Sequence, residues 1–295
     1  MTSPAGTASA RTAPVAIPLG RENLLPLLLT LALVGAALAW NMAVGLAWRV
    51  PLTAILAVPV ACLGLAAFYC TVRPDPAIAE MALYVGLWFL YPVFGTHLTY
   101  LANSLGFPLR DALFAGWDAA LGFHWLDWAR FVAAHPHLRD VQAFAYESCL
   151  WQAPLIVALL ALRGPRGRNA EFLTAMLVAL TITIAANMLW PSLGPAAFNG
   201  VSSDTADIIR RLRDGAPGPF AYAGIIPFPS FHTVIALLYT AALRGRRILF
   251  PAALALNAMM LSAIPFSGNH YLVDIIAGAA IALLSLGAAR QCCAR

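Results

Sequence analysis

The chain has 295 residues, of which 61% are hydrophobic and only 11% are charged, and its mean hydropathy is +0.77. A soluble domain carries about 25% charged residues, so this composition excludes a soluble globular protein. All eighteen basic residues are arginine, and the net charge of +5 is interpreted as a signal of membrane topology, with no indication of a nucleic-acid partner.

The first expected element is a disordered tail over residues 1–20, which is rich in Ala, Pro, Thr and Ser. Eight apolar segments that we predict to be membrane-spanning helices follow it. They lie near residues 24–48, 51–72, 78–101, 141–162, 172–190, 229–243, 248–266 and 271–289. The sequence therefore predicts an all-α, polytopic membrane helix bundle, with N-terminal transmembrane helices over 21–103 and a second membrane region over 104–290.

The arginines predict which ends of these helices face the cytoplasm. With the N-terminus inside, the connections "RGPRGR" (163–168) and "RGRR" (244–247) are cytoplasmic, and so is the C-terminal tail. The cytoplasmic segments then hold eleven Arg and four acidic residues, whereas the outer segments hold seven Arg and seven Asp. This asymmetry supports the orientation and places the beginnings of the segments at 229 and 271 on the outer side.

The two longest connections, 102–140 and 191–228, are outer segments in this orientation. The first contains "DALFAGWDAALGFHWLDWARFVAAH", where Trp recurs at roughly helical spacing, and we predict helices that lie in the membrane interface. In the second, Ser203 or Asp204 is predicted to cap a short helix that ends at Gly215.

Ionisable side chains stand at the outer beginnings of two apolar segments. His270 and Asp274 are four residues apart, so on a helix they share a face, and a hydrogen-bonded carboxylate would fix the tautomer of the ring. His232 follows "PFPS", where Ser230 is a natural N-cap. The opening N–H groups of such a helix favour a phosphate.

A phosphate held there would have a nucleophilic histidine on one side and a second histidine, able to protonate the departing oxygen, on the other. This inventory suffices for phosphoryl transfer through a phosphohistidine and requires no metal or other cofactor. A polar cluster that only joins helices, and metal ligation by His232, His270 and Asp274 with His97 as a fourth ligand, are the alternatives.

"PSFH" and "HYLVD" resemble the second and third motifs of the type 2 phosphatidic acid phosphatase superfamily. "GNHYLVDIIAG", "WPSLGPA" and "DAALGFHW" are most similar to the branch that contains inositol phosphorylceramide synthase. The resemblance covers residues 105–290 and implies His270 as nucleophile, Asp274 as its orienting partner and His232 as general acid. It implies a phosphatase- or phosphotransferase-like core over 104–290.

Two of the superfamily's cationic positions are missing from this chain. "NMLWPSLGP" has neither the Lys nor the Arg of the first motif, and "SAIPFSGNH" lacks the Arg that precedes the histidine of the third. These departures favour the synthase-like branch. Arg210 and Arg211 are therefore candidates for binding the phosphate, and so are Arg213 and Arg110. Further candidates for the headgroup pocket are Ser230, Asn187 and Glu147, although the last two can also pair between helices.

The sequence thus predicts an integral membrane enzyme, in the plasma membrane of a bacterium, that acts on a lipid phosphoester at the outer face. Its preferred activity is transfer of a phospho-headgroup, and the alternative is hydrolysis of a lipid or isoprenoid phosphate by the same residues. A transporter with a polar site is the alternative from another class, but its polar residues would lie near the midplane of the membrane. The oligomeric state is left open.

Overall fold

The fold was obtained as a computed structural model that describes residues 21–46, 51–165, 167–216 and 224–293. The predicted disordered tail over 1–20 lies outside these residues. The described part of the chain is helical and contains no strand. Its long helices are α1 (Arg21–Val44), α2 (Leu52–Thr71), α3 (Pro76–Ser104), α6 (Pro136–Glu147), α7 (Cys149–Arg163), α8 (Arg168–Leu189), α11 (Phe231–Ala242), α12 (Leu249–Ala263) and α13 (Leu272–Cys293). The shorter elements are α4 (Asp111–Ala120), α5 (Trp125–Ala133), α9 (Pro195–Phe198), α10 (Asp204–Arg213) and the 3-10 turn η1 (Pro265–Ser267).

Several helices begin at side chains that satisfy their opening N–H groups. The carboxylate of Asp75 accepts hydrogen bonds from the N–H groups of Ala77 and Ile78, both at 3.1 Å, at the start of α3. Ser203 caps α10 by accepting from the N–H of Ala206 at 3.3 Å, which confirms the short helix predicted there.

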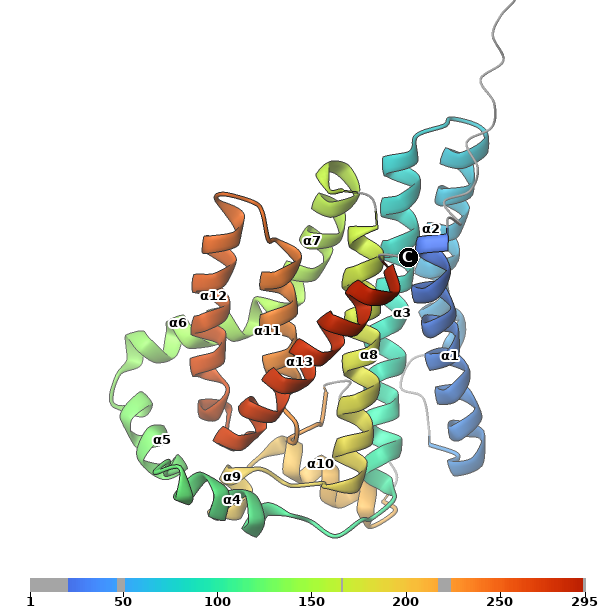
Figure 1. Cartoon of the computed structure of the whole chain (residues 1–295). Coiled ribbons are helices and arrows are strands. Elements are labelled where there is room, and N and C mark those ends of the chain that lie inside the picture. The colour runs from blue at the N-terminus through green and yellow to red at the C-terminus, as the bar shows by residue number, and fades with distance from the viewer. Residues whose placement is uncertain (1–20, 47–50, 166, 217–223, 294–295) are drawn as a thin grey trace, which may run out of the picture.

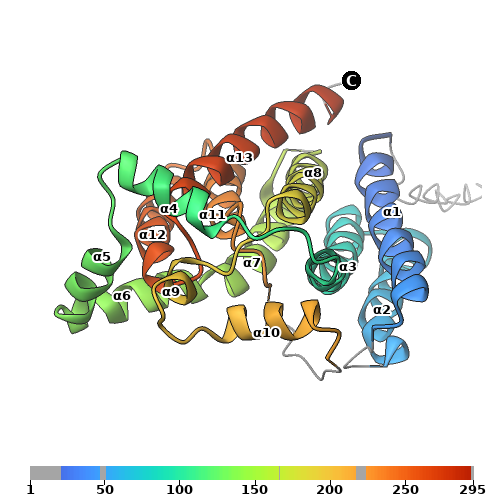
Figure 2. The same cartoon turned by 90° about the horizontal axis from the view of Figure 1, so that it is seen from below.

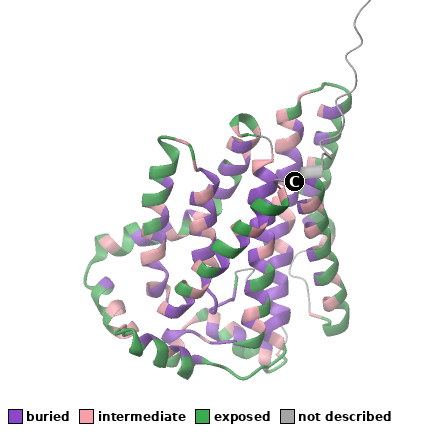
Figure 3. Cartoon of the chain, viewed as in Figure 1, coloured by how far each residue is buried: buried purple, intermediate pink, exposed green. Residues whose placement is uncertain are grey.

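The centre of the bundle is α8, which packs against α3, α11 and α13 and is the most buried of the long apolar helices (Figures 1 and 3). In contrast, α1 and α2 lie on one side of α3 and expose most of their surface. Their exposed residues are large and apolar, as Leu56, Val60 and Leu63 on α2 illustrate. Such a surface is suited to hydrocarbon and not to water.

Each predicted membrane segment corresponds to a helical region, but the count of eight spans is not confirmed. Among the described residues, six helices are long and apolar enough to cross a membrane, and a seventh span results if α6 and α7 form one helix bent by 45°. The segment predicted over 141–162 therefore begins earlier, at Pro136. The segment predicted over 229–243 is α11, which has only 12 residues.

At about 1.5 Å per residue, α11 is roughly 18 Å long, well short of the ~30 Å hydrocarbon core of a bilayer.

The two ends of the bundle differ in chemistry. Helices α11 and α13 begin at the end that carries His232 and His270, which we call the histidine end. The short helices α4, α9 and α10 gather at this end (Figures 1 and 2). At the opposite end, which we call the arginine end, α8 begins and α11 stops, next to Arg168 and Arg244.

Candidate active site

The first turns of α11 and α13 are in direct contact. Ser230, the N-cap of α11, accepts a hydrogen bond from the N–H of Thr233 at 3.3 Å, and its own N–H donates to the carbonyl oxygen of Asp274 at 3.0 Å. Gly278 permits this contact, because a Cβ at that position would lie 2.4 Å from the Ser230 carbonyl oxygen and 2.9 Å from the Thr233 Cβ. The two motifs that begin these helices are thereby brought together.

His270 is buried, with 3% of its surface exposed, and its Nδ1 lies 2.6 Å from the carbonyl oxygen of Pro227. A carbonyl oxygen can only accept, so Nδ1 carries the proton, and in the neutral ring Nε2 has the lone pair. The loop before α11 therefore fixes the tautomer of a histidine that precedes α13. This tautomer is the one required for nucleophilic attack by Nε2.

Asp274 lies beside His270, as predicted, but at a longer distance than a direct hydrogen bond requires. Its Oδ2 is 3.6 Å from Nδ1 of His270 and accepts a hydrogen bond from the N–H of Tyr271 at 2.7 Å. The fully buried carboxylate therefore places a negative charge next to the ring, while the carbonyl of Pro227 accepts the short hydrogen bond. The predicted orienting role of Asp274 stays a prediction.

His232 faces His270 from the first turn of α11. The ring centroids of the two histidines are 6.1 Å apart and the ring planes are inclined by 72°. Tyr146 of α6 stacks on His232 with centroids 4.1 Å apart, and its hydroxyl lies 3.1 Å from Nδ1. Because Nδ1 is engaged by Tyr146, Nε2 is the nitrogen of His232 left to act on a substrate.

Both histidines line a cavity of about 300 Å³ that extends along α3, α7 and α11. On α3 the lining runs from Trp88 to Thr99, which corresponds to about 16 Å along the helix axis. Most of the lining is apolar, and Leu150 at its α7 side is 79% exposed. The cavity therefore combines two histidines with a long apolar wall that reaches the surface of the bundle, as an acyl chain would require.

Several predicted binding residues lie away from this cavity. Ser230 is buried as the N-cap of α11, and Arg210 on α10 pairs with Asp207 at 2.8 Å, both side chains being well exposed. Arg213 donates to the carbonyl of Gly106. Within the described part of the chain, no arginine lines the cavity of the histidines, and neither do Ser230, Asn187, Glu147, Arg110, Arg210 and Arg211.

Asn187 is fully buried in α8, and both polar atoms of its side chain lack a hydrogen-bond partner among the described residues. His97, considered as a metal ligand, instead has Nε2 2.8 Å from Oδ1 of Asn41 on α1. Neither residue is brought to the pair of histidines. The roles predicted for Asn187, Arg210 and Arg211 in substrate binding therefore stay predictions. None of the three residues lines the cavity of the histidines.

Two carboxylates of α4 hold the turn that contains His270, and sequence reasoning missed them. Asp118 accepts hydrogen bonds from the N–H groups of Leu272 and Val273, at 2.8 and 3.0 Å, and so caps α13. Asp111 accepts from the hydroxyl of Tyr271 at 3.1 Å, beside His270. The two aspartates are seven residues apart on one face of a helix, and this spacing was the available signal.

Asp111 also joins this turn to the "WPSLGP" segment by accepting from the N–H groups of Leu193 and Gly194, each at 3.0 Å. Gly194 has φ +92°, and a Cβ there would lie 2.8 Å from the carbonyl oxygen of Asn269. Burial raises the pKa of Asp111 and Asp118, and the hydrogen bonds that they accept partly offset this. The two carboxylates are therefore costly to bury unless they keep these partners.

We predict that Asp118→Ala lowers turnover by about 10- to 100-fold, because a displacement of ~1 Å at a reacting group can cost about 100-fold. The loss of an N-cap should reduce stability by only about 1 kcal/mol. Asp118→Asn keeps one acceptor oxygen and should recover part of the activity. Steady-state rates and thermal melting of each variant measure the two effects.

The matched control is Asp127→Ala, which removes an exposed carboxylate from the adjacent α5. It should leave turnover within a factor of about two, since its partner Arg130 is also exposed. If Asp118→Ala has the melting temperature of the wild type and also its turnover rate, Asp118 does not position His270.

A comparison with protein families identifies the family of the chain. A family model described as the PAP2 superfamily matches residues 112–288, which is more than half of the 295-residue chain and includes α11 and most of α4 and α13. No curated protein and no solved structure matches the chain significantly.

Proposed function

The chain belongs to the PAP2 superfamily of membrane phosphatases and phosphotransferases. From this premise we propose that it is a lipid phosphotransferase. We propose further that the transferred phosphoryl group is carried by a phosphohistidine on His270. The observation that carries the proposal is the pair of histidines at the starts of α11 and α13, which line one apolar cavity of about 300 Å³. A phosphoester on a lipid chain suits this combination. The six or seven apolar spans found in the described part of the chain are in keeping with a membrane enzyme.

In the first step, Nε2 of His270 forms a bond to phosphorus while the bond from phosphorus to the leaving oxygen breaks. The electron pair moves to that oxygen, which takes a proton from His232. The nearby carboxylate of Asp274 stabilises the positive charge that develops on the phosphorylated ring. The Pro227 carbonyl keeps the proton on Nδ1 throughout, so Nε2 remains the reactive nitrogen.

In the second step, the hydroxyl of an acceptor gives its proton to His232 and its oxygen attacks phosphorus. The bond between phosphorus and Nε2 breaks, which restores His270. Transfer requires an alcohol as acceptor, whereas hydrolysis requires water. The predominantly apolar lining of the cavity and the missing cations of the "NMLWPSLGP" and "SAIPFSGNH" motifs favour an alcohol and the synthase-like branch.

The orientation proposed for the protein places the histidine end outside the cytoplasm, on the positive-inside rule. The arginine end carries Arg163, Arg168, Arg244 and Arg246, which supports this assignment. A bacterial plasma membrane is the proposed location, with the active site at its outer face.

The test is a single-turnover reaction in lipid nanodiscs with a phospholipid labelled in its headgroup phosphate. We expect a labelled protein whose label is lost in acid and kept in alkali, as a phosphohistidine requires. Addition of diacylglycerol or a polyol should divert the label into a new phosphoester. Release of inorganic phosphate alone, whatever the alcohol, would identify a phosphatase, and absence of label on the protein under every condition would contradict the phosphohistidine.

A further inference from the structure

A second cavity, of about 440 Å³, lies at the arginine end of the bundle, away from both histidines. It is formed by the end of α7, the beginning of α8 and the turn between α11 and α12. Its described lining includes four arginines and no acidic residue: Arg163, Arg168, Arg244 and Arg246. This concentration of one charge in one cavity calls for an explanation beyond the helix ends themselves.

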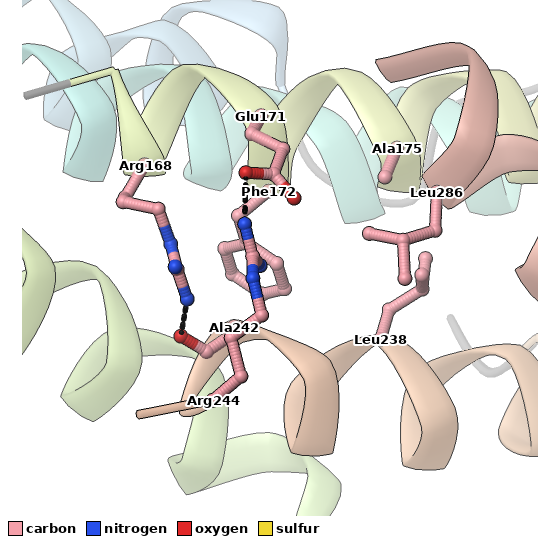
Figure 4. A pocket seen from close by; sticks show the side chains of 8 residues that line it. All are labelled: Arg168, Glu171, Phe172, Ala175, Leu238, Ala242, Arg244 and Leu286. Atoms are coloured by element: carbon pink, nitrogen blue, oxygen red, sulfur yellow. Dashed lines mark hydrogen bonds and ion pairs between the residues drawn. The ribbon is translucent and has the colours of Figure 1, made fainter. Parts of the chain in front are cut away.

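Three of the four arginines are held in place by side-chain contacts that use only part of their hydrogen-bonding capacity. Arg168 donates through Nη2 to the carbonyl oxygen of Ala242 at 2.8 Å, and Arg244 donates to the carboxylate of Glu171 at 2.5 Å (Figure 4). Arg246 donates to the carbonyl of Arg163. Because a guanidinium group has five N–H donors, each retains donors with which to bind an oxyanion.

The neighbouring carboxylate does not balance this charge. Glu171 is shared between Arg244 and Arg290, the second at 3.2 Å, and only 10% of its side chain is exposed. Arg168 is attracted by Glu171 but repelled by Arg244, Arg246 and Arg290. Like charges gathered at a partly buried site raise the free energy of the folded state unless an anion joins them.

We propose that this cavity binds the phosphate of an anionic phospholipid in the leaflet opposite the active site. A guanidinium fork matches a phosphate, and basic pockets between the cytoplasmic ends of membrane helices suit anionic headgroups. Exposed apolar residues lie close in sequence to the lining arginines: Leu162 on α7 directly precedes Arg163 and is 55% exposed, and Ile248, directly before α12, is 79% exposed. They would contact the acyl chains of a lipid but offer nothing to a free phosphate ion.

Membrane topology alone is the competing explanation, since cytoplasmic arginines orient a membrane protein without any binding site. Topology depends on the number of charges and not on their place in a cavity. Arg247 and Arg73 therefore provide a matched control, because both are exposed at the same end and neither lines the cavity. The double variant Arg247→Gln/Arg73→Gln removes the same charge as Arg163→Gln/Arg246→Gln.

The experiment measures binding of phosphatidylglycerol by native mass spectrometry, in a His270→Ala background that prevents turnover of the probe. At about 1 kcal/mol for each arginine near an anionic lipid, the Arg163→Gln/Arg246→Gln variant should bind roughly 30-fold more weakly. The control double variant should bind as the parent does. Arg246→Lys keeps the charge and should retain most of the binding. Binding should also weaken with added salt.

Thermal melting in detergent separates the possible ligands and checks the folding of each variant. Phosphatidylglycerol should raise the midpoint of the parent, whereas phosphatidylcholine and inorganic phosphate should not. The proposal would be overturned if the two double variants lost phosphatidylglycerol binding equally. It would also be overturned if phosphatidylcholine raised the melting midpoint as much as phosphatidylglycerol does. Stabilisation by inorganic phosphate as large as that by the lipid would overturn it as well. Because these readouts do not involve the reaction, failure here leaves the proposed function untouched, and the reverse also holds.

Discussion

The His270→Ala variant is expected to lose at least about 10⁴-fold in turnover, as enzymes that lose a covalent nucleophile do. Alanine removes Nε2, the only atom of this residue that can bond to phosphorus, and no other described histidine except His232 lines the cavity. The rate should be measured with a labelled phospholipid in nanodiscs, together with the amount of acid-labile label on the protein. Both should fall to background.

His137→Ala is the matched control, because it removes an exposed histidine from the start of α6. It should retain full activity and the labelled intermediate. A His270→Ala enzyme that turns over normally, or that still acquires acid-labile label, would rule out the nucleophile. Asp274→Asn should have a smaller effect than His270→Ala, because the Pro227 carbonyl still holds the tautomer and only the negative charge is lost.

The His232→Ala variant should be impaired according to the leaving group of the substrate. A general acid contributes about 10²- to 10⁴-fold when the leaving oxygen is a poor one, and far less when the leaving group is stable without a proton. We therefore expect a loss in that range on a lipid phosphoester with an alkoxide leaving group. On an activated aryl phosphate the loss should be roughly tenfold or less. Rates of both mutants on both substrates give the comparison.

His270→Ala serves as the control for this comparison, since a nucleophile is needed whatever group leaves. It should be inactive on both substrates. If the turnover rate of His232→Ala falls by the same factor on the lipid and on the aryl phosphate, His232 binds the phosphate and does not donate a proton to the leaving group.

The helical membrane bundle and the members of the histidine pair could be predicted from sequence for physical reasons. Apolar segments of sufficient length have few alternatives to helices in a bilayer. His270 and Asp274 were predicted to be neighbours from their four-residue spacing on a helix, but His270 precedes α13, and the turn closed by the hydrogen bond from the Tyr271 N–H to Asp274 places them 3.6 Å apart. The contact between the rings of His232 and His270 could be found only in the folded structure. The sequence did predict that both histidines lie at the beginnings of segments on the same side of the membrane.

The partners of these residues could not be predicted in the same way. The carbonyl of Pro227 and the N–H groups of Leu272 and Val273 are backbone atoms, which leave no trace in the choice of side chain. The segment with Asp111 and Asp118 was interpreted as an interfacial helix, and the role of its buried face was missed. Its partners are separated from it by 82 to 160 residues along the chain.

The start of α11 could be predicted, because Ser230 is a natural N-cap, and the helix lies within the predicted segment 229–243. Ser230 fixes the start by capping Thr233, and the carbonyl of Asp274 holds Ser230 itself.

The two faces of α4 meet different surroundings, and this has a practical consequence. One face holds the turn of His270 through Asp111 and Asp118, while the other exposes Leu113, Trp117 and Leu121, at 42%, 47% and 55%. A bilayer supplies an interface on which such a face rests, whereas a small, strongly curved detergent micelle supports it poorly. Purification in detergent can therefore lower the measured activity without unfolding a single transmembrane helix. A substrate that gives weak activity in detergent should be tested again after reconstitution into a bilayer before it is dismissed.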